Sequence, residues 1–574
     1  MTTPSGPSGE VGEIDDDEVS VDAEFDAGTA FDAEFDVPLD GEPEPGSPLA
    51  ATTTVTTTIT RTDPAPATTR VPTWRAGIAE LRKAGHFEEA ARRVREELPP
   101  KPAAADRLEA GVSLAAVSDY DAANAQLLLA SLDERQAPAA LAKLSEVAWV
   151  RHDHTRGREY ALEGLQLEPG FRGCRIQLRR NEKAEAAANS LGDTSGMVAH
   201  AAFHADPHGN AGDLALVDSV RRGFDLEYAP RAGRGLKSPT THPRWWDVHV
   251  HQLFDEKRLA QVNAGDGLVL GGGGLFLPDT APNGNSGWQW NVTDEMLRRI
   301  KVPLVVWGVG YNTFEGQEFD GSRFGRSLRT LVERAGFVGL RNSGSVEKVR
   351  SLLPSELADK IRWQPCPTTV ISKLGGPAWE QAPDGDGSGG PVLLNCAYDR
   401  SARRFGDGYG QFLASLRDWI LATRERAEVR YAAHCVDDEI FVNDLRREHG
   451  LTLPVIPMYD MTVPEIHTTY RRAALVVGMR GHAGMVPFGC GTPIVSLVSH
   501  PKLAFFLADI GREEWGISVH EPDLGPRLRE LTGRLLDERA SVVEDIERLQ
   551  QRLFDVTLEN LGTLPEPLRV VPRG

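Results

Sequence analysis

The sequence has few cysteines and no long apolar run. Its 574 residues include five cysteines, none spaced as C-x-x-C, which argues against a disulfide framework and a thiolate zinc site and fits a reducing compartment. No stretch reaches the roughly 20 apolar residues that a membrane-spanning helix needs. The N-terminus is acidic and has no apolar core of a secretory signal. We therefore expect a cytoplasmic protein without a membrane span.

Lysine and arginine are absent from the first 45 residues, which hold 15 Asp and Glu. Much of the formal net charge of −20 is therefore local, although the overall acidity still argues against a nucleic-acid partner. Residues 1–72 repeat Asp-Ala-Glu-Phe-Asp at 22–26 and 32–36, then become Pro- and Thr-rich. Such a composition cannot offset the entropy of ordering, so we predict a disordered tail. It is either solubilising or a docking motif.

Residues 73–195 are rich in Ala and Leu and contain a degenerate repeat. The segments GHFEEAARRV, SDYDAANAQL and HDHTRGREYA place Phe87, Tyr120 and His154 at equivalent positions, with spacings of 33 and 34 residues. This period predicts stacked helical hairpins, and the region resembles tetratricopeptide repeats. His154 and Arg158 depart from that pattern. Two functions fit: a groove that binds a protein partner, or a helical cap packed on an enzyme domain.

From residue 196 the pattern changes to short apolar runs that alternate with helix-like stretches. Runs such as DGLVLGGGGLF, VPLVVWGVGYN, PVLLNCAYD and ALVVGMRGHA indicate parallel strands buried on both faces. We predict an α/β fold with two doubly wound, Rossmann-like lobes. The expected divisions are an N-terminal lobe at 196–373, a Gly/Pro/Asp linker at 374–390, a C-terminal lobe at 391–530, and a C-terminal helix and tail at 531–574. Ligands of such sheets bind at the carboxyl ends of the strands.

A run of four glycines follows the first of these strands. The backbone of Gly272, Gly273 and Gly274 carries no side chains, so its N–H groups can approach an anion or a sugar closely. A tight strand-to-helix turn is the other interpretation. The spacing matches neither the dinucleotide fingerprint G-x-G-x-x-G nor a Walker loop.

Two arginines also follow predicted strands. Arg341 comes after GFVGL and precedes Asn342 and Ser343, which can cap a helix, so it can seat a phosphate or carboxylate beside a helix N-terminus. A surface salt bridge is the alternative. After RAALVV, Arg480 and His482 lie two residues apart, where a guanidinium can grip an oxyanion while an imidazole transfers a proton. Lys502 can reach the same anion, or lie on the solvated surface.

A third group of residues could bind an acceptor. Asn210 and Asp213 open a helix, where they either bind hydroxyls or only cap it. Trp288 and Trp290 could stack on a sugar ring or pack in the core. His434, after VRYAA, either lines the cleft or is structural.

Together these motifs resemble the polysaccharide pyruvyl transferase family over about 204–510. The resemblance rests on the segments HGNAGDLAL, DGLVLGGGGLF, PLVVWGVGYN, GLRNSGS and GMRGHAGMVPFGCGTPIVSLVSHPK. It implies a fold similar to the glycosyltransferase B (GT-B) architecture. Members transfer the enolpyruvyl part of phosphoenolpyruvate to two hydroxyls of a sugar, making a pyruvate ketal in polysaccharide biosynthesis. Many of them carry a larger aliphatic residue where this chain has Gly481.

The resemblance also implies roles for individual residues. Arg480 and His482 match the family's arginine–x–histidine motif, which contacts phosphoenolpyruvate, and Arg341 matches a second donor-binding arginine. His482 is our candidate general acid, and His434 and Asp213 are candidates for the base. We expect phosphoenolpyruvate and a saccharide as partners, with no cofactor and no essential metal.

Two other functions fit the sequence. A nucleotide-sugar glycosyltransferase would share the fold and the style of FGCGTPIVS. Such enzymes commonly hold the ribose with a glutamate, and no acidic residue lies between Arg480 and Ser499. The other possibility is a catalytically silent domain that binds a glycan or metabolite while the helical repeats recruit a partner.

Overall fold

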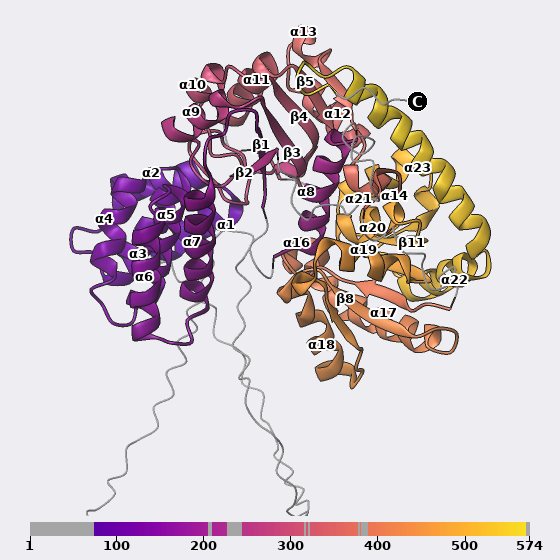
Figure 1. Cartoon of the computed structure of the whole chain (residues 1–574). Helices are drawn as coiled ribbons and strands as arrows, with labels where there is room; N and C mark the ends of the chain where they lie inside the picture. The colour runs from indigo at the N-terminus through magenta and orange to yellow at the C-terminus, as the bar shows by residue number, and fades with distance from the viewer. Residues whose placement is uncertain are drawn as a thin grey trace, which may run out of the picture.

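The computed structural model describes residues 74–204, 209–226, 244–314, 317–319, 322–376, 379 and 389–569. The acidic, Thr/Pro-rich tail at 1–72 lies outside these residues, as does most of the linker expected at 374–390. Within the described part, a helical region precedes two α/β lobes (Figure 1).

The helical region consists of consecutive antiparallel hairpins. Phe87, Tyr120 and His154 each begin the second helix of a hairpin, so the repeat read from the sequence marks real structural units. Their inward faces form a core of small and branched side chains, with Ile78 and Leu127 fully buried. The helices are α1 (Trp74–Ala84), α2 (Phe87–Glu97), α3 (Ala104–Ala116), α4 (Tyr120–Ala130), α5 (Ala137–Val150), α6 (His154–Leu167) and α7 (Arg172–Ser190).

The N-terminal lobe is built on a parallel six-stranded sheet of order β2-β1-β3-β4-β5-β6. Its central strands are buried along almost their whole length, which is why they appear in the sequence as continuous apolar runs. The strands are β1 (Val198–Ala202), β2 (Trp245–His249), β3 (Gly267–Phe276), β4 (Leu304–Tyr311), β5 (Phe337–Leu340) and β6 (Ile361–Trp363). The helices are α8 (Ala211–Phe224), α9 (Glu256–Ala264), α10 (Asp294–Arg299), α11 (Arg323–Arg334), α12 (Ser343–Ser351), α13 (Ser355–Ala358) and α14 (Ile371–Leu374).

The C-terminal lobe has a second parallel six-stranded sheet, of order β12-β11-β10-β7-β8-β9. The expected fold, two Rossmann-like lobes in a GT-B-like arrangement after a helical region, is confirmed. The strands are β7 (Val392–Asn395), β8 (Val429–Ala433), β9 (Val455–Pro457), β10 (Leu475–Gly478), β11 (Ile494–Val498) and β12 (Gly516–Ser518). The helices are α16 (Ser401–Phe405), α17 (Tyr409–Thr423), α18 (Glu439–His449), α19 (Val463–Arg471), α20 (Gly481–Gly489), α21 (Pro501–Ile510), α22 (Leu524–Asp537) and α23 (Arg539–Gly562).

The long C-terminal helix α23 ties the two lobes together along their outer edge (Figure 1). At its middle it packs on the C-terminal lobe, where Gln550 donates to the carbonyl of Phe488. Near its end, Asn560 donates to the carbonyl of Trp363 at 2.9 Å in the N-terminal lobe. The helix therefore contacts both lobes.

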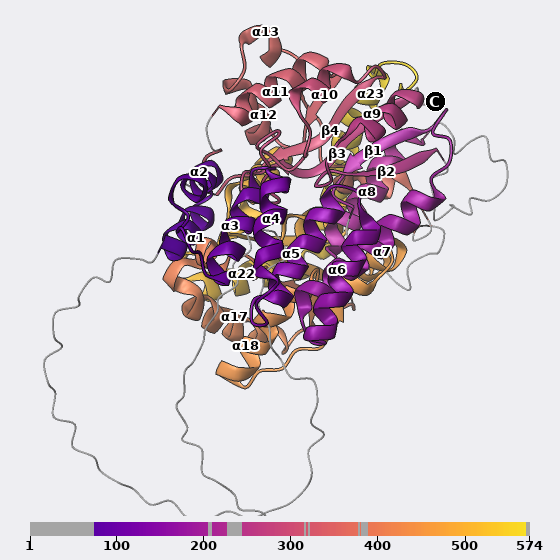
Figure 2. The same ribbon diagram turned by 90° about the vertical axis from the view of Figure 1, so that its left-hand side faces the viewer.

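Hydrogen bonds join the helical region to the N-terminal lobe, which lies above it in the view of Figure 2. The backbone N–H of Leu253 donates to the carbonyl of Val150 at 2.9 Å, and Asn291 donates to the hydroxyl of Tyr120 at 2.8 Å. A third bond runs from the N–H of Gly284 to Ser118. These contacts are those of a helical cap packed on the α/β lobes, while a protein partner of the repeats stays a prediction.

No helix in the described ranges combines the length and the apolarity needed to span a membrane.

Candidate functional site

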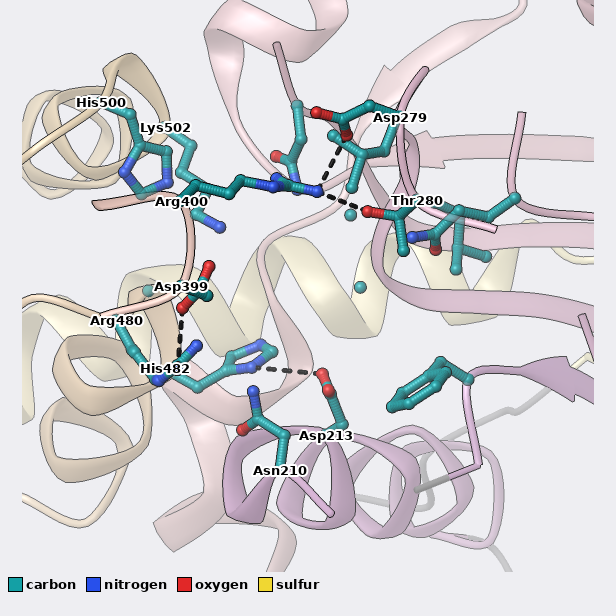
Figure 3. A pocket seen from close by; sticks show the side chains of 18 of the residues that line it. Asn210, Asp213, Asp279, Thr280, Asp399, Arg400, Arg480, His482, His500 and Lys502 are labelled. Carbon is teal, nitrogen blue, oxygen red and sulfur yellow. Dashed lines mark hydrogen bonds and ion pairs between the residues drawn. The ribbon is translucent and has the colours of Figure 1, made fainter. Parts of the chain in front are cut away.

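A cavity of about 820 Å³ lies between the lobes at the carboxyl ends of the strands (Figure 3). Most residues chosen from the sequence reach it, although they come from segments far apart in the chain. The predicted residues that line it are Asn210, Asp213, Gly272, Gly273, Gly274, Arg341, Arg480, His482 and Lys502.

The glycine run lies within strand β3 and not in a turn after it. Gly271, Gly272 and Gly273 have φ angles of 137°, 51° and 96°, which side-chain-bearing residues rarely adopt. A Cβ atom at Gly274 would collide with the side-chain amide of Asn312. The tight-turn interpretation is therefore wrong, and the run makes room for polar side chains at the floor of the cavity. Whether its N–H groups hold an anion stays a prediction.

Arg341 is buried directly after β5 and forms no ion pair with any described residue. Its Nη2 donates to Asn312 at 2.7 Å, while its Nε has no hydrogen-bond partner. Burial lowers the pKa of the guanidinium. The next residue, Asn342, caps helix α12 by accepting the N–H of Ser345 at 2.7 Å, as the sequence suggested. The surface salt bridge considered for Arg341 is excluded by its burial.

Arg480 is held by two carboxylates at the start of helix α20. Its Nε and Nη2 donate to Asp438 at 2.9 and 2.6 Å, and Nη2 lies 2.8 Å from Asp399. Asp438 in turn accepts N–H groups from His434 and Asn395. This network fixes the guanidinium in one orientation, and in the described residues no hydrogen bond uses its Nη1.

His482 faces Asp213 across the cleft (Figure 3). The imidazole Nδ1 lies 3.7 Å from a carboxylate oxygen of Asp213, on the first turn of α8. Burial raises the pKa of Asp213 to about 6, opposed by the charges of Lys502, Arg480 and Arg341. Burial, with repulsion from Arg341 and Lys502, lowers the pKa of His482 well below its usual value. The imidazole is therefore neutral near pH 7.

Lys502, on the first turn of α21, completes the group of cations. No described side chain forms a hydrogen bond or ion pair with its ammonium group. Its pKa is held well below the usual value by burial and by the nearby charges of Arg341 and Arg404. A Cβ at Gly481 would meet only the flexible end of Lys502, at 3.4 Å from Cε. The glycine at 481 therefore leaves space beside this lysine.

Three of the predicted acceptor residues do not reach the cavity. Trp288 and Trp290 are 1% and 0% exposed in the core of the N-terminal lobe, where Trp288 donates to Ser327. They cannot stack on a sugar. His434 is also fully buried, and its Nε2 is hydrogen-bonded to the hydroxyl of Tyr470. Burial lowers its pKa to about 3, so it is a structural histidine.

Asn210 and Asp213 have different roles at the start of α8. Asn210 caps the helix by accepting the N–H of Gly212 at 2.8 Å, and it also lines the cavity. The Asp213 carboxylate makes no capping bond among the described residues and is 24% exposed toward the cleft. Gly212 is required here, since a Cβ at that position would collide with the ring of His482.

Sequence reasoning missed several charged residues of the site. Arg400 donates to Asp279 at 2.8 Å across the cleft, and Arg404 pairs with Asp399 at 2.9 Å. The helical region contributes Arg82, Lys83 and Phe87 to the same cavity. The arginine-rich run DRSARR follows strand β7, and this position could have predicted that Arg400 and Arg404 lie at the cleft. No sequence motif predicted that residues of the helical region would line the cavity.

The described residues contain no group of three His, Cys, Asp or Glu side chains arranged to hold a metal ion.

Two Rossmann-like lobes with a cleft lined by several cationic side chains define a GT-B-like protein. The model of the polysaccharide pyruvyl transferase family matches residues 210–501, just over half of the chain, and the chain belongs to this family. The resemblance read from the sequence is thereby confirmed. No curated protein sequence matches the chain significantly.

Solved structures with a similar arrangement include a mutant O-GlcNAc transferase of Thermobaculum terrenum, which is 15% identical with a TM-score of 0.38. The alignment covers 86% of this chain and 98% of that one. Another is UDP-GlcNAc 2-epimerase from Neisseria meningitidis bound to UDP-GlcNAc, with 10% identity and a TM-score of 0.34, covering 64% and 100%. At these scores the architecture rests on the two sheets themselves.

Proposed function

We propose that the protein transfers the pyruvyl group of phosphoenolpyruvate to two hydroxyls of a saccharide, forming a cyclic ketal and releasing phosphate. Family membership supports a transfer of this kind. One observation carries the choice of donor. Arg341 from the N-terminal lobe, which is buried, and Lys502 from the C-terminal lobe, which is partly buried, face one cavity and have no ion-pair partner among the described residues.

The donor would supply the anionic partner that Arg341 and Lys502 do not have among the described residues. Phosphoenolpyruvate carries a carboxylate and a phosphate, and charge-assisted hydrogen bonds to such groups are stronger than neutral ones. Arg480 is already oriented by Asp438 and presents its Nη1 without a fresh ordering cost. The three cations therefore suit a small dianionic or trianionic ligand that spans the cleft.

The reaction requires one proton to be delivered to carbon and two to be taken from hydroxyls. Protonation of the methylene carbon of the donor gives an oxocarbenium-like centre at C2, which the first sugar hydroxyl attacks as it loses its proton. Phosphate then leaves with the C–O bonding pair, and the second hydroxyl attacks C2 and loses its proton. One released proton replaces the one delivered, and the other accompanies the phosphate.

Asp213 and His482 are the groups that we assign to these transfers. A carboxyl group with a pKa of about 6 exchanges protons readily near neutral pH, and it lies 3.7 Å from the imidazole. An anion bound against Arg341 and Lys502 offsets their repulsion of a protonated His482, so the imidazole gains basicity when the donor arrives. His482 remains our general acid, now in partnership with Asp213, while His434 is no longer a candidate for the base.

Isothermal titration of phosphoenolpyruvate into the full chain tests the proposal. We expect the wild type to bind and Arg341→Met to bind at least tenfold more weakly, because one charge-assisted contact of about 1.5–3 kcal/mol is lost. Arg329→Met is the matched control, since Arg329 is exposed on α11 and does not line the cavity.

Release of phosphate on adding a glycan acceptor then tests the transfer itself. A folded wild type that binds a nucleotide sugar but not phosphoenolpyruvate contradicts the proposal and favours a glycosyltransferase. A chain that binds the donor and a glycan but never releases phosphate is a catalytically silent binder.

A further inference from the structure

A second cavity of about 750 Å³ adjoins the first and is not used by the proposed reaction. The two cavities share Arg403 and His500 as lining residues, so they meet along one wall. The second lies at the carboxyl ends of β11 and β12 in the C-terminal lobe. Its other side is formed by Phe314 of the N-terminal lobe and by the helical region.

The turn between α1 and α2 separates the two cavities. Every residue from 82 to 87 lines one or the other: Arg82, Lys83 and Phe87 line the first, and Ala84, Gly85 and His86 line the second. A short stretch of the helical region is therefore a wall of the catalytic cleft.

This turn is held firmly in place. Arg82 makes a two-point salt bridge to Glu109, with contacts of 2.7 and 3.2 Å. Arg403 of the C-terminal lobe donates to the carbonyl of Lys83 at 3.2 Å. Gly85 has a φ of 89°, a conformation that allows the chain to reverse between the helices. Since both ends are fixed, the turn can act as a rigid selective surface.

The lining of the second cavity matches a carbohydrate better than a charged or apolar ligand. It presents three imidazoles, from His86, His500 and His520, together with the hydroxyl of Ser518 and the carboxylate of Glu318. Imidazoles and hydroxyls donate and accept hydrogen bonds as sugar hydroxyls do, and a carboxylate accepts them. The cation Arg403 is balanced by Asp279 at 3.5 Å. Phe314 adds an aromatic ring, as pockets for small polar ligands commonly do.

We propose that the second cavity is a glycan subsite, which holds the residues of the acceptor next to the one that is pyruvylated. This inference rests on the proposed function for the reaction that the neighbouring sugar undergoes. Binding of a glycan in the second cavity does not depend on which donor is used. Ligand pockets commonly measure roughly 300–1,000 Å³, and both cavities fall in this range. We assign the donor and one sugar to the first cavity and the sugars that follow to the second. The protein recognises an oligosaccharide, with the α1–α2 turn as the selecting wall.

A glycan microarray of mono- to hexasaccharides, probed with the full chain, tests the subsite. Ala84→Trp fills the second cavity from an exposed position at the end of α1. Ala186→Trp on α7 is the matched control, because Ala186 is equally exposed and lines neither cavity. We expect the wild type and the control to bind oligosaccharides and not monosaccharides, and Ala84→Trp to bind them at least tenfold more weakly.

A second variant, His520→Ala, removes a hydrogen-bonding group without adding bulk and should weaken binding of the same glycans severalfold. Titration of phosphoenolpyruvate into Ala84→Trp separates the two proposals, since donor affinity should be unchanged. The subsite is overturned if the array shows no glycan binding, if monosaccharides bind as tightly as longer chains, or if Ala84→Trp and His520→Ala bind like the wild type. A wild type that does not bind phosphoenolpyruvate instead contradicts the proposed pyruvyl transfer.

Discussion

Replacing Lys502 by methionine tests the electrostatic logic of the cleft. Methionine keeps most of the apolar stem and removes the ammonium group, which faces the cavity (Figure 3). The pKa of Lys502 is well below its usual value in the folded chain. At neutral pH the folded state therefore holds this proton less tightly than the unfolded state does. Below an unfolded pKa of about 10.4 the group consequently opposes folding.

The substitution should thus have opposite effects on stability and on binding. The free energy of unfolding of Lys502→Met at pH 7 should equal or exceed that of the wild type, because a partly buried amine without an ion-pair partner is removed. Affinity for phosphoenolpyruvate should fall about 10- to 100-fold, the equivalent of a charge-assisted hydrogen bond of about 1.5–3 kcal/mol.

Urea denaturation and isothermal titration measure the two quantities. The matched control is Lys257→Met, at an exposed lysine on α9 that lines neither interlobe cavity and should change neither value. A Lys502→Met variant that is less stable yet binds the donor as the wild type does would refute the reasoning. Its lysine would then be a structural cation with a partner.

Three further substitutions test separate parts of the site. Arg480→Ala should lower the free energy of unfolding by about 3–5 kcal/mol in urea, because it leaves Asp438 buried without its cation; a wild-type stability would show that the pair contributes nothing. The pKa of Asp213 is raised from its ordinary value of 3.8 to about 6, so the wild type loses free energy of unfolding as pH rises above about 4. Asp213→Asn cannot ionise, so the difference in free energy of unfolding between Asp213→Asn and the wild type should grow by about 2 kcal/mol between pH 4 and 7. A gain that is flat with pH in denaturation curves would contradict this. Tyr470→Phe should lower the free energy of unfolding by about 1–3 kcal/mol, because it removes the hydrogen-bond partner of the His434 Nε2 atom. Its affinity for phosphoenolpyruvate should be unchanged, and a lower affinity would indicate that His434 contributes to the site.

The fold could be predicted because its strands are parallel and buried. A strand covered on both faces needs apolar residues at every position, so β7 and β10 stand out as short continuous runs between helices. All carboxyl ends of a parallel sheet lie at one edge. Residues that follow the strands, such as Arg341, Arg480 and Lys502, could therefore be assigned to one cleft without knowing any distance.

Side-chain direction could not be predicted in the same way. Trp288 and Trp290 lie in a loop-like sequence near the cleft, yet they turn into the core, while Gln289 between them lines the cavity. His434 follows a strand, as Arg341 does, but it turns back toward Tyr470. The position of a residue along the chain fixes the edge of the sheet, and only packing decides which way its side chain points.

Contacts between distant segments were the second limit. Asp399 and Asp438 orient Arg480 from two different strand ends, and nothing in the local sequence pairs them. The contribution of Arg82 to the cleft depends on how a separate helical region docks on the N-terminal lobe. Such docking follows from the shapes of two folded surfaces, which no periodicity encodes.

The ion pairs divide the cations of the cleft into two functional groups. Arg400, Arg404 and Arg480 are each matched by an aspartate, so they are oriented before any ligand arrives. Arg341 and Lys502 belong to opposite lobes, have no acidic partner in the described part of the chain, and repel each other. An anion placed between them removes that repulsion and attracts both lobes at once. Binding of the proposed donor should therefore favour closure of the cleft, because the anion attracts two cations that repel each other in its absence.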